Sequence, residues 1–127
     1  MKVLFYLANI ILSTYSYSPV WSQSNLECNY SGTQSQMNVC AEREFLTSDL
    51  ELNQIYNELI SCLIEKKFKT LLTEQRTWLR ARDSKCKKLA NNEAKGGSMW
   101  PMLFNSCRAT STKARIEQLK KWKKQPA

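Results

Sequence analysis

Four of the five cysteines lie where the pairing of helices would bring them together. Cys86 and Cys107 are placed symmetrically about Gly96-Gly97, so a turn at these glycines would set the two sulfurs opposite each other in a helical hairpin. Cys28 and Cys40 flank a short polar stretch that leads into the start of a helix. We therefore expect the disulfides Cys28–Cys40 and Cys86–Cys107, each worth roughly 3 kcal/mol if it is unstrained.

The first 22 residues have the features of a secretory signal peptide. One positive charge precedes an apolar run over residues 3–12, and Val20 and Ser22 stand at the recognition positions of a cleavage site. The apolar run is shorter than the roughly 20 residues of a membrane span, and Cys28 lacks the small preceding residues of a lipoprotein signal. We expect a periplasmic or secreted protein, residues 23–127, with no transmembrane segment after cleavage. Its cysteines should be oxidised, because disulfides persist in such compartments.

The composition of residues 23–127 favours a single all-α domain. The whole chain has only three glycines and three prolines, and helix-forming residues dominate its later part. The segment Thr33-Gln34-Ser35-Gln36 fits a capping box, and apolar residues recur from there at helical spacing. A second periodic pattern ends before Gly96-Gly97, and Ser98 is placed to cap a third helix with Pro101 in its first turn. The patterns predict a disulfide-stapled antiparallel bundle of about three long helices.

Cys62 is the odd cysteine. It lies on the apolar stripe of the first predicted helix, and this position favours a buried thiol over an intermolecular disulfide.

Charge is distributed unevenly along the chain, whose formal net charge is +8. Between residues 23 and 65 seven acidic residues accompany one base, whereas from residue 66 onward seventeen bases accompany four acids. Such asymmetry is typical of an acidic helix packed on a basic one, with the excess positive charge facing solvent. It also fits a protein that binds an anionic polymer or surface through its third helix. That basic face would comprise Lys113, Arg115, Lys120, Lys121, Lys123 and Lys124 with Trp122.

The residue types exclude most enzyme chemistry. The chain has no histidine, so a serine or cysteine nucleophile would lack its usual base. Zinc would lack ligands as well, because four of the five sulfurs are expected in disulfides. We therefore expect no catalytic residue, no metal and no cofactor, and no motif indicates specific nucleic-acid binding.

The most distinctive segment runs from Gln75 to Cys86. Gln75, Trp78, Arg82 and Cys86 share one face of a helix, which should point inward. An inward arginine needs an acceptor, because an unpaired buried charge is strongly destabilising. Asp49 shares a face of the first helix with Asn53 and Tyr56, and we predict an ion pair between Arg82 and Asp49. In this interpretation the residues of the segment form a scaffold rather than a contact surface.

These residues resemble the LprI-type, lysozyme-inhibitor-like family of small exported bacterial proteins. The resemblance covers nearly all of residues 23–127, and the order of cysteines combined with W-x-x-x-R-D-x-x-C is its specific part. The matching residues are Cys28, Thr33-Gln34, Met37-Asn38, Cys40, Asp49, Leu52-Asn53, Tyr56, Gln75, Trp78, Arg82-Asp83, Cys86, Gly96-Gly97-Ser98, Cys107, Thr112 and Arg115.

The resemblance implies a disulfide-bonded helical domain that binds a lysozyme and blocks its glycosidase cleft. The segment from Asn91 to Ser98 is then the natural insertion element. It is polar and carries Lys95 beside Gly96 and Gly97, which allow a close backbone approach. Two alternatives remain: the basic protein that binds an anionic polymer or surface, and a structural or stress protein of the envelope without inhibitory activity.

Overall fold

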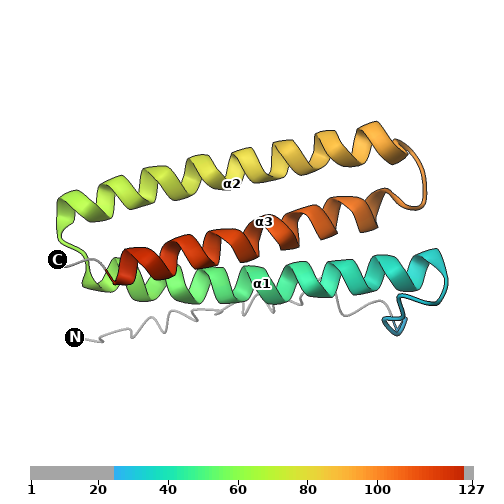
Figure 1. The fold of residues 1–127 in the computed structure, drawn as a ribbon, viewed down its shortest axis with the longest axis horizontal. Coiled ribbons are helices and arrows are strands. Elements are labelled where there is room, and N and C mark those ends of the chain that lie inside the picture. Colours follow the sequence, from blue (N-terminus) through green and yellow to red (C-terminus); the bar gives the residue numbers. More distant parts are fainter. Residues whose placement is uncertain (1–24, 125–127) are drawn as a thin grey trace, which may run out of the picture.

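The computed structural model describes residues 25–124 as three long antiparallel helices (Figure 1). Helix α1 spans Gln34–Cys62, α2 spans Glu65–Ala94 and α3 spans Trp100–Lys123. The all-α, three-helix prediction is confirmed. The predicted signal peptide, residues 1–22, lies outside the described residues. Within residues 25–124 none of the helices is both long and apolar enough to cross a membrane.

The start of α1 follows the predicted capping box. The Thr33 hydroxyl accepts a hydrogen bond from the backbone N–H of Gln36 at 3.3 Å, and the Gln36 side chain accepts one from the Thr33 N–H at 2.9 Å. Two N–H groups that the first turn leaves without a helical partner are thereby satisfied. Helix α1 ends at Cys62, because the backbone of Leu63 is extended, and α2 begins two residues after Leu63.

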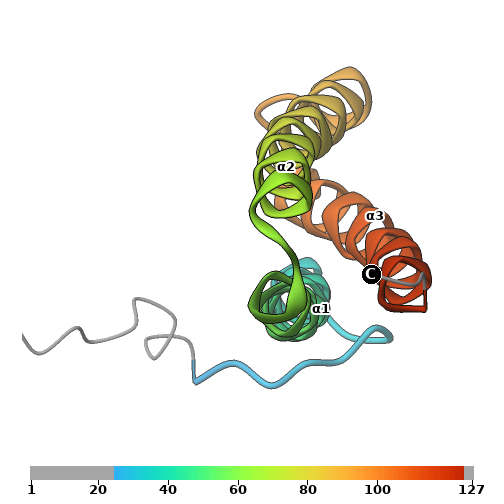
Figure 2. The same ribbon diagram turned by 90° about the vertical axis from the view of Figure 1, so that its left-hand side faces the viewer.

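Helix α3 holds the bundle together, because it packs along both α1 and α2 (Figure 2). The buried core draws on all three helices and consists of Leu52, Leu59, Leu71, Ile116 and Leu119. Burying a leucine or isoleucine side chain contributes about 1.5–3 kcal/mol, so this cluster is the main source of tertiary stability.

Both expected disulfides are present. Cys28–Cys40 has a Cα–Cα distance of 4.7 Å and ties the arm before α1 to its second turn. Cys86–Cys107 has a Cα–Cα distance of 5.5 Å and joins α2 to α3 near the turn between them. The second half of α2 is therefore covalently linked to the first half of α3.

Cys62 departs from the prediction, because its thiol is exposed rather than buried. The residue is the last of α1, and the chain leaves the helix immediately after it. Leu63, Trp122 and Lys123 lie around it without covering its thiol, and a periodic pattern alone does not show how completely a residue is covered.

The predicted cap of the third helix is also wrong. The N-cap is Met99, which makes no side-chain capping bond, and Pro101 lies in the first turn. Ser98 has another role, because its carbonyl oxygen accepts a hydrogen bond from Asn38 Nδ2 at 2.9 Å. Because Pro101 has no backbone N–H, the first turn of α3 has one fewer free N–H group for a side-chain cap to accept from.

Charges of opposite sign line the seam between α1 and α3. Three lysines of α3 meet three glutamates that are spaced seven residues apart on α1. The pairs are Lys113–Glu44 at 3.7 Å, Lys120–Glu51 at 3.7 Å and Lys123–Glu58 at 3.0 Å. The expected packing of an acidic helix on a basic one is thus present, although exposed pairs of this kind contribute only about 0–1 kcal/mol each.

Candidate binding site

Arg82 is the centre of a buried polar cluster. Its side chain is only 5% exposed, and Nη1 donates to Asp49 Oδ1 and to Thr112 Oγ1, each at 3.2 Å. Its Nε donates to Asp83 Oδ1 at 2.9 Å. The predicted pair with Asp49 is present, and all three helices contribute to the cluster.

Aromatic rings cover the remaining faces of this guanidinium. The Arg82 Cζ atom lies 5.0 Å from the centre of the Phe45 ring and 5.3 Å from that of Trp78. Arginine stacks favourably on such rings, most strongly where water is excluded. Arg82 is therefore buried inside the bundle and presents almost no surface to a partner, whereas Trp78 is half-buried.

Not every residue of the expected inner face joins this cluster. Asn53 lies one helical turn after Asp49, but it is exposed and has no hydrogen bond within residues 25–124. Tyr56 is half-buried against the apolar core, and its hydroxyl has no partner there. Gln75 is buried and accepts a hydrogen bond from Arg115 Nε at 2.9 Å.

Arg115 does not belong to the solvent-facing basic surface that the sequence predicted for α3. It is only 8% exposed and lies at the α2–α3 seam, so it is not part of a solvent-facing cationic surface. Burial lowers the pKa of its guanidinium, while Glu74 acts in the opposite direction. Since Lys113, Lys120 and Lys123 are paired with α1, the face proposed for anionic polymers is largely neutralised.

Sequence reasoning missed the role of Arg108. Its guanidinium carbon lies 3.7 Å from the centre of the Phe45 ring and 4.1 Å from that of Phe104. Its Nη2 donates to Asn105, and burial lowers the pKa of the group. The sequence contained one indication of this role. Phe45 and Phe104 lie on two different predicted helices, and two such rings can hold a planar guanidinium between them.

The turn between α2 and α3 holds all four candidate binding residues, and each of them is exposed. Gly96 has a φ of 74°, a conformation that favours glycine. The Gly97 N–H donates to the Ala94 carbonyl at 2.8 Å, and the Trp100 N–H donates to the Gly97 carbonyl at 3.2 Å. Lys95 makes no hydrogen bond or ion pair with any residue in the range 25–124, so its ammonium is available to a partner.

Contacts on both sides of the turn make it a fixed projection. Trp100 Nε1 donates to Asn91 Oδ1 at 2.8 Å, and the Trp100 ring stacks on Phe104 with centroids 4.8 Å apart. Asn38 of α1 holds the Ser98 carbonyl, and Cys86–Cys107 closes the hairpin behind the turn. A preordered turn loses little conformational entropy when it binds.

Comparison with known proteins places the chain in a family. The family model described as lysozyme inhibitor LprI matches residues 27–119. An uncharacterized protein of Rhizobium meliloti is 32% identical over 111 residues, which cover 77% of this chain and 79% of the relative. No solved structure matches the chain significantly. The family match includes both disulfides, the Arg82 cluster and the projecting turn, and the chain belongs to the LprI lysozyme inhibitor family.

Proposed function

We propose that the protein is an exported lysozyme inhibitor that binds in the enzyme's cleft through the turn formed by residues 95–98. Membership of the LprI family supports a lysozyme as the partner. The observation that carries the choice of surface is Lys95, an exposed cation that has no side-chain partner among residues 25–124 and lies on a turn that is held from both sides. The two disulfides agree with a periplasmic or secreted location.

The chemistry of a glycosidase cleft suits such a turn. Glycosidases of this kind use a pair of carboxyl groups that flank the scissile bond. An ammonium group inserted between them would be attracted to the ionised carboxylate, most strongly where the cleft excludes water, and could donate a hydrogen bond to the protonated one. The exposed glycines at 96 and 97 add no side chain, so the backbone can follow the ammonium into a narrow opening.

The formal net charge limits how the complex forms: it is +8 for the whole chain and +7 for residues 23–127, because Lys2 lies in the predicted signal peptide. A basic lysozyme would be repelled at long range, so the attraction has to arise locally at the turn. Added salt screens the repulsion over roughly 8–10 Å, and the association rate with a basic lysozyme should therefore rise with ionic strength. An acidic lysozyme should show the opposite salt dependence.

The test is steady-state inhibition of a chicken-type, a goose-type and a bacterial lysozyme on cell-wall substrate. Occupation of the cleft predicts competitive kinetics, in which the apparent KM rises and kcat is unchanged. A drop in kcat at constant KM would place the contact outside the cleft. Failure to inhibit any of the three enzymes at micromolar concentration would reject the proposal. N-terminal sequencing of the protein recovered from the periplasm or medium tests export, with Gln23 as the expected first residue.

A further inference from the structure

Most of the excess positive charge within residues 25–124 lies on α2. This helix carries nine bases and four acids, whereas α1 and α3 together carry seven bases and six acids. Three ion pairs join α1 and α3 along their seam. Figure 2 shows that one side of α2 faces away from both other helices. The positive charge on that side is therefore not offset by the rest of the bundle.

Five bases lie on this outer side of α2. By helical spacing they fall within about a third of the circumference, in a row about 33 Å long. Each is exposed, and its side chain makes no hydrogen bond or ion pair with any residue in the range 25–124. We call them the basic face: Lys66, Arg76, Arg80, Lys87 and Lys88.

Two of the four acids of α2 are occupied by other bases of the same helix. Glu65 is paired with Lys69 at 2.7 Å. Asp83 accepts a hydrogen bond from the buried Arg82 at 2.9 Å. Neither carboxylate is therefore available to neutralise the basic face.

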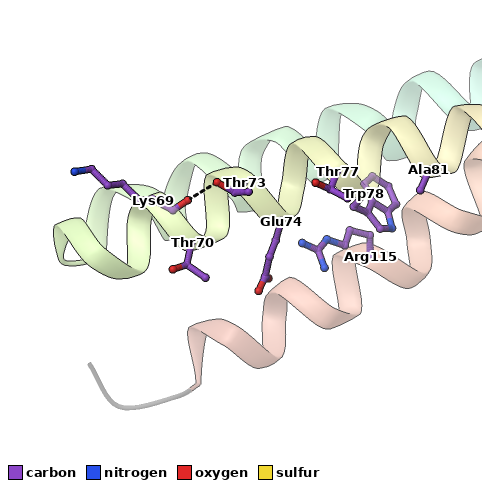
Figure 3. Close-up of a pocket in the computed structure, with 8 residues that line it drawn as sticks. All are labelled: Lys69, Thr70, Thr73, Glu74, Thr77, Trp78, Ala81 and Arg115. Atoms are coloured by element: carbon purple, nitrogen blue, oxygen red, sulfur yellow. Dashed lines mark hydrogen bonds between the residues drawn. The ribbon is translucent and has the colours of Figure 1, made fainter.

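The other two acids point in other directions. Glu74 lines an open pocket between α2 and α3, and Figure 3 shows its side chain directed toward α3 whereas that of Lys69 points away. Glu93 lies about 120° around the helix axis from Lys87. The basic face thus contains no acid of its own, and its field is directed into solvent.

The side chains of this face suit contact with anionic groups at a surface. The residues between its bases on the same side of α2 are Thr73, Thr77 and Ser84, so no apolar or aromatic side chain interrupts the row. A nucleic-acid base would find no ring on which to stack. The face also lacks the apolar anchors with which an amphipathic helix enters the acyl region of a membrane.

We propose that the basic face docks the protein on an anionic lipid surface, through contacts between its bases and lipid phosphates. The helix runs without a sharp bend (Figure 1), so its row of bases can touch a plane along its whole length. Lipids diffuse in the plane until a phosphate meets each base, whereas a flexible soluble polyanion would lose conformational entropy on the same row. The two disulfides indicate export, and an exported protein meets the membranes of the envelope. The face excludes residues 95–98, so this docking is independent of the proposed inhibitory turn.

The experiment is cosedimentation of the exported protein, residues 23–127, with vesicles of mixed phosphatidylglycerol and phosphatidylcholine. These anionic vesicles should bind the protein saturably, and vesicles of pure phosphatidylcholine should not. Added salt should weaken the binding steeply, because it screens exposed charges. No binding to the anionic vesicles, equal binding to neutral ones, or tighter binding to duplex DNA or soluble polyphosphate at the same phosphate concentration would each overturn the proposal.

Paired variants test the choice of face. One base near an anionic membrane strengthens binding about fivefold, so Arg76→Gln with Arg80→Gln should lower the partition coefficient at least about tenfold. Lys121→Gln with Lys124→Gln is the matched control, because it removes the same charge from exposed side chains of the α3 end that have no partner among residues 25–124. The control should stay within about twofold of the wild type. Equal losses in the two double variants would show that net charge, rather than the basic face, governs the binding.

A fluorophore tests the orientation of the bound protein. In a Cys62→Ser background, Ser84→Cys places the label in the middle of the basic face, and vesicles should shield it from acrylamide. Thr47→Cys places the label on α1 beside its seam with α3, where quenching should not change. Shielding at position 47 that equals or exceeds shielding at position 84 would overturn the proposed orientation.

Discussion

Arg82 of α2 and Asp49 of α1 are joined by an ion pair of 3.2 Å, although both helices pack chiefly against α3. The arginine is 5% exposed and the aspartate 31%, so water screens the pair incompletely. Thr112 of α3 accepts from the same Nη1 atom. One guanidinium therefore fixes the position of α2 relative to the other two helices.

Removal of either partner should destabilise the fold. We expect Arg82→Ala to lower the free energy of unfolding by about 2–4 kcal/mol, because it leaves the half-buried Asp49 without its counter-charge. Asp49→Ala should lower it by less, because Asp83 still pairs with Arg82. The double variant should lose less than the sum. Urea denaturation measures all three, and Lys113→Ala serves as the exposed-pair control with an expected loss of about 0–1 kcal/mol. Additive losses below about 0.5 kcal/mol would show that Arg82 and Asp49 do not interact.

The native protein should contain one reactive thiol, at Cys62. Its exposure predicts rapid labelling by a thiol reagent without denaturant, and Cys62→Ser should abolish the reaction. Non-reducing peptide mapping should recover Cys28–Cys40 and Cys86–Cys107. A bridge that includes Cys62, or labelling that needs denaturant, would contradict the helix register described above.

The Tyr30 hydroxyl should lose its proton only at unusually high pH, because its pKa is raised. The hydrogen bond from its hydroxyl to Glu44, 2.6 Å long, raises its pKa from 10.0 to about 12, with smaller contributions from burial and the glutamate charge. A raised folded-state pKa means that this contact stabilises the fold below about pH 10 and that its contribution disappears as the pH passes about 12. Absorbance at 295 nm in a Tyr56→Phe variant of residues 23–127 isolates this group. Glu44→Gln should return its pKa toward 10.0, and titration near 10.0 in both proteins would exclude the contact.

The sequence predicted most of the fold because its strongest signals are local or periodic. The capping box at Thr33 depends on residues three apart, and the apolar period identified the helix faces that meet in the core. The Arg82–Asp49 pair was accessible because both residues lie on inward faces and a buried arginine requires an acceptor.

The errors concern residues whose neighbours belong to another element. Cys62 continues the apolar stripe, but it is the last residue of α1 and its thiol is exposed. Arg115 looks like one more base of a cationic helix, yet it is buried at the seam with α2. Asn53 shares its helical face with Asp49 and remains exposed. Helix periodicity gives the direction of a side chain but not the distance to the next helix, which decides whether the side chain is buried.

The central claim is that the turn carrying Lys95 occupies a lysozyme cleft, and the inhibition constant of Lys95→Glu tests it most directly. The variant places a third carboxylate beside the catalytic pair, and at physiological salt it should inhibit at least about tenfold more weakly than the wild type. Lys87→Glu makes the same charge change on α2, at an exposed side chain that has no partner among residues 25–124, and its inhibition constant should stay within about twofold of the wild-type value. Circular dichroism checks that both variants fold. The account is contradicted if Lys95→Glu inhibits as well as Lys87→Glu, and loss of inhibition in Glu44→Lys and Glu51→Lys would then place the docking surface on α1.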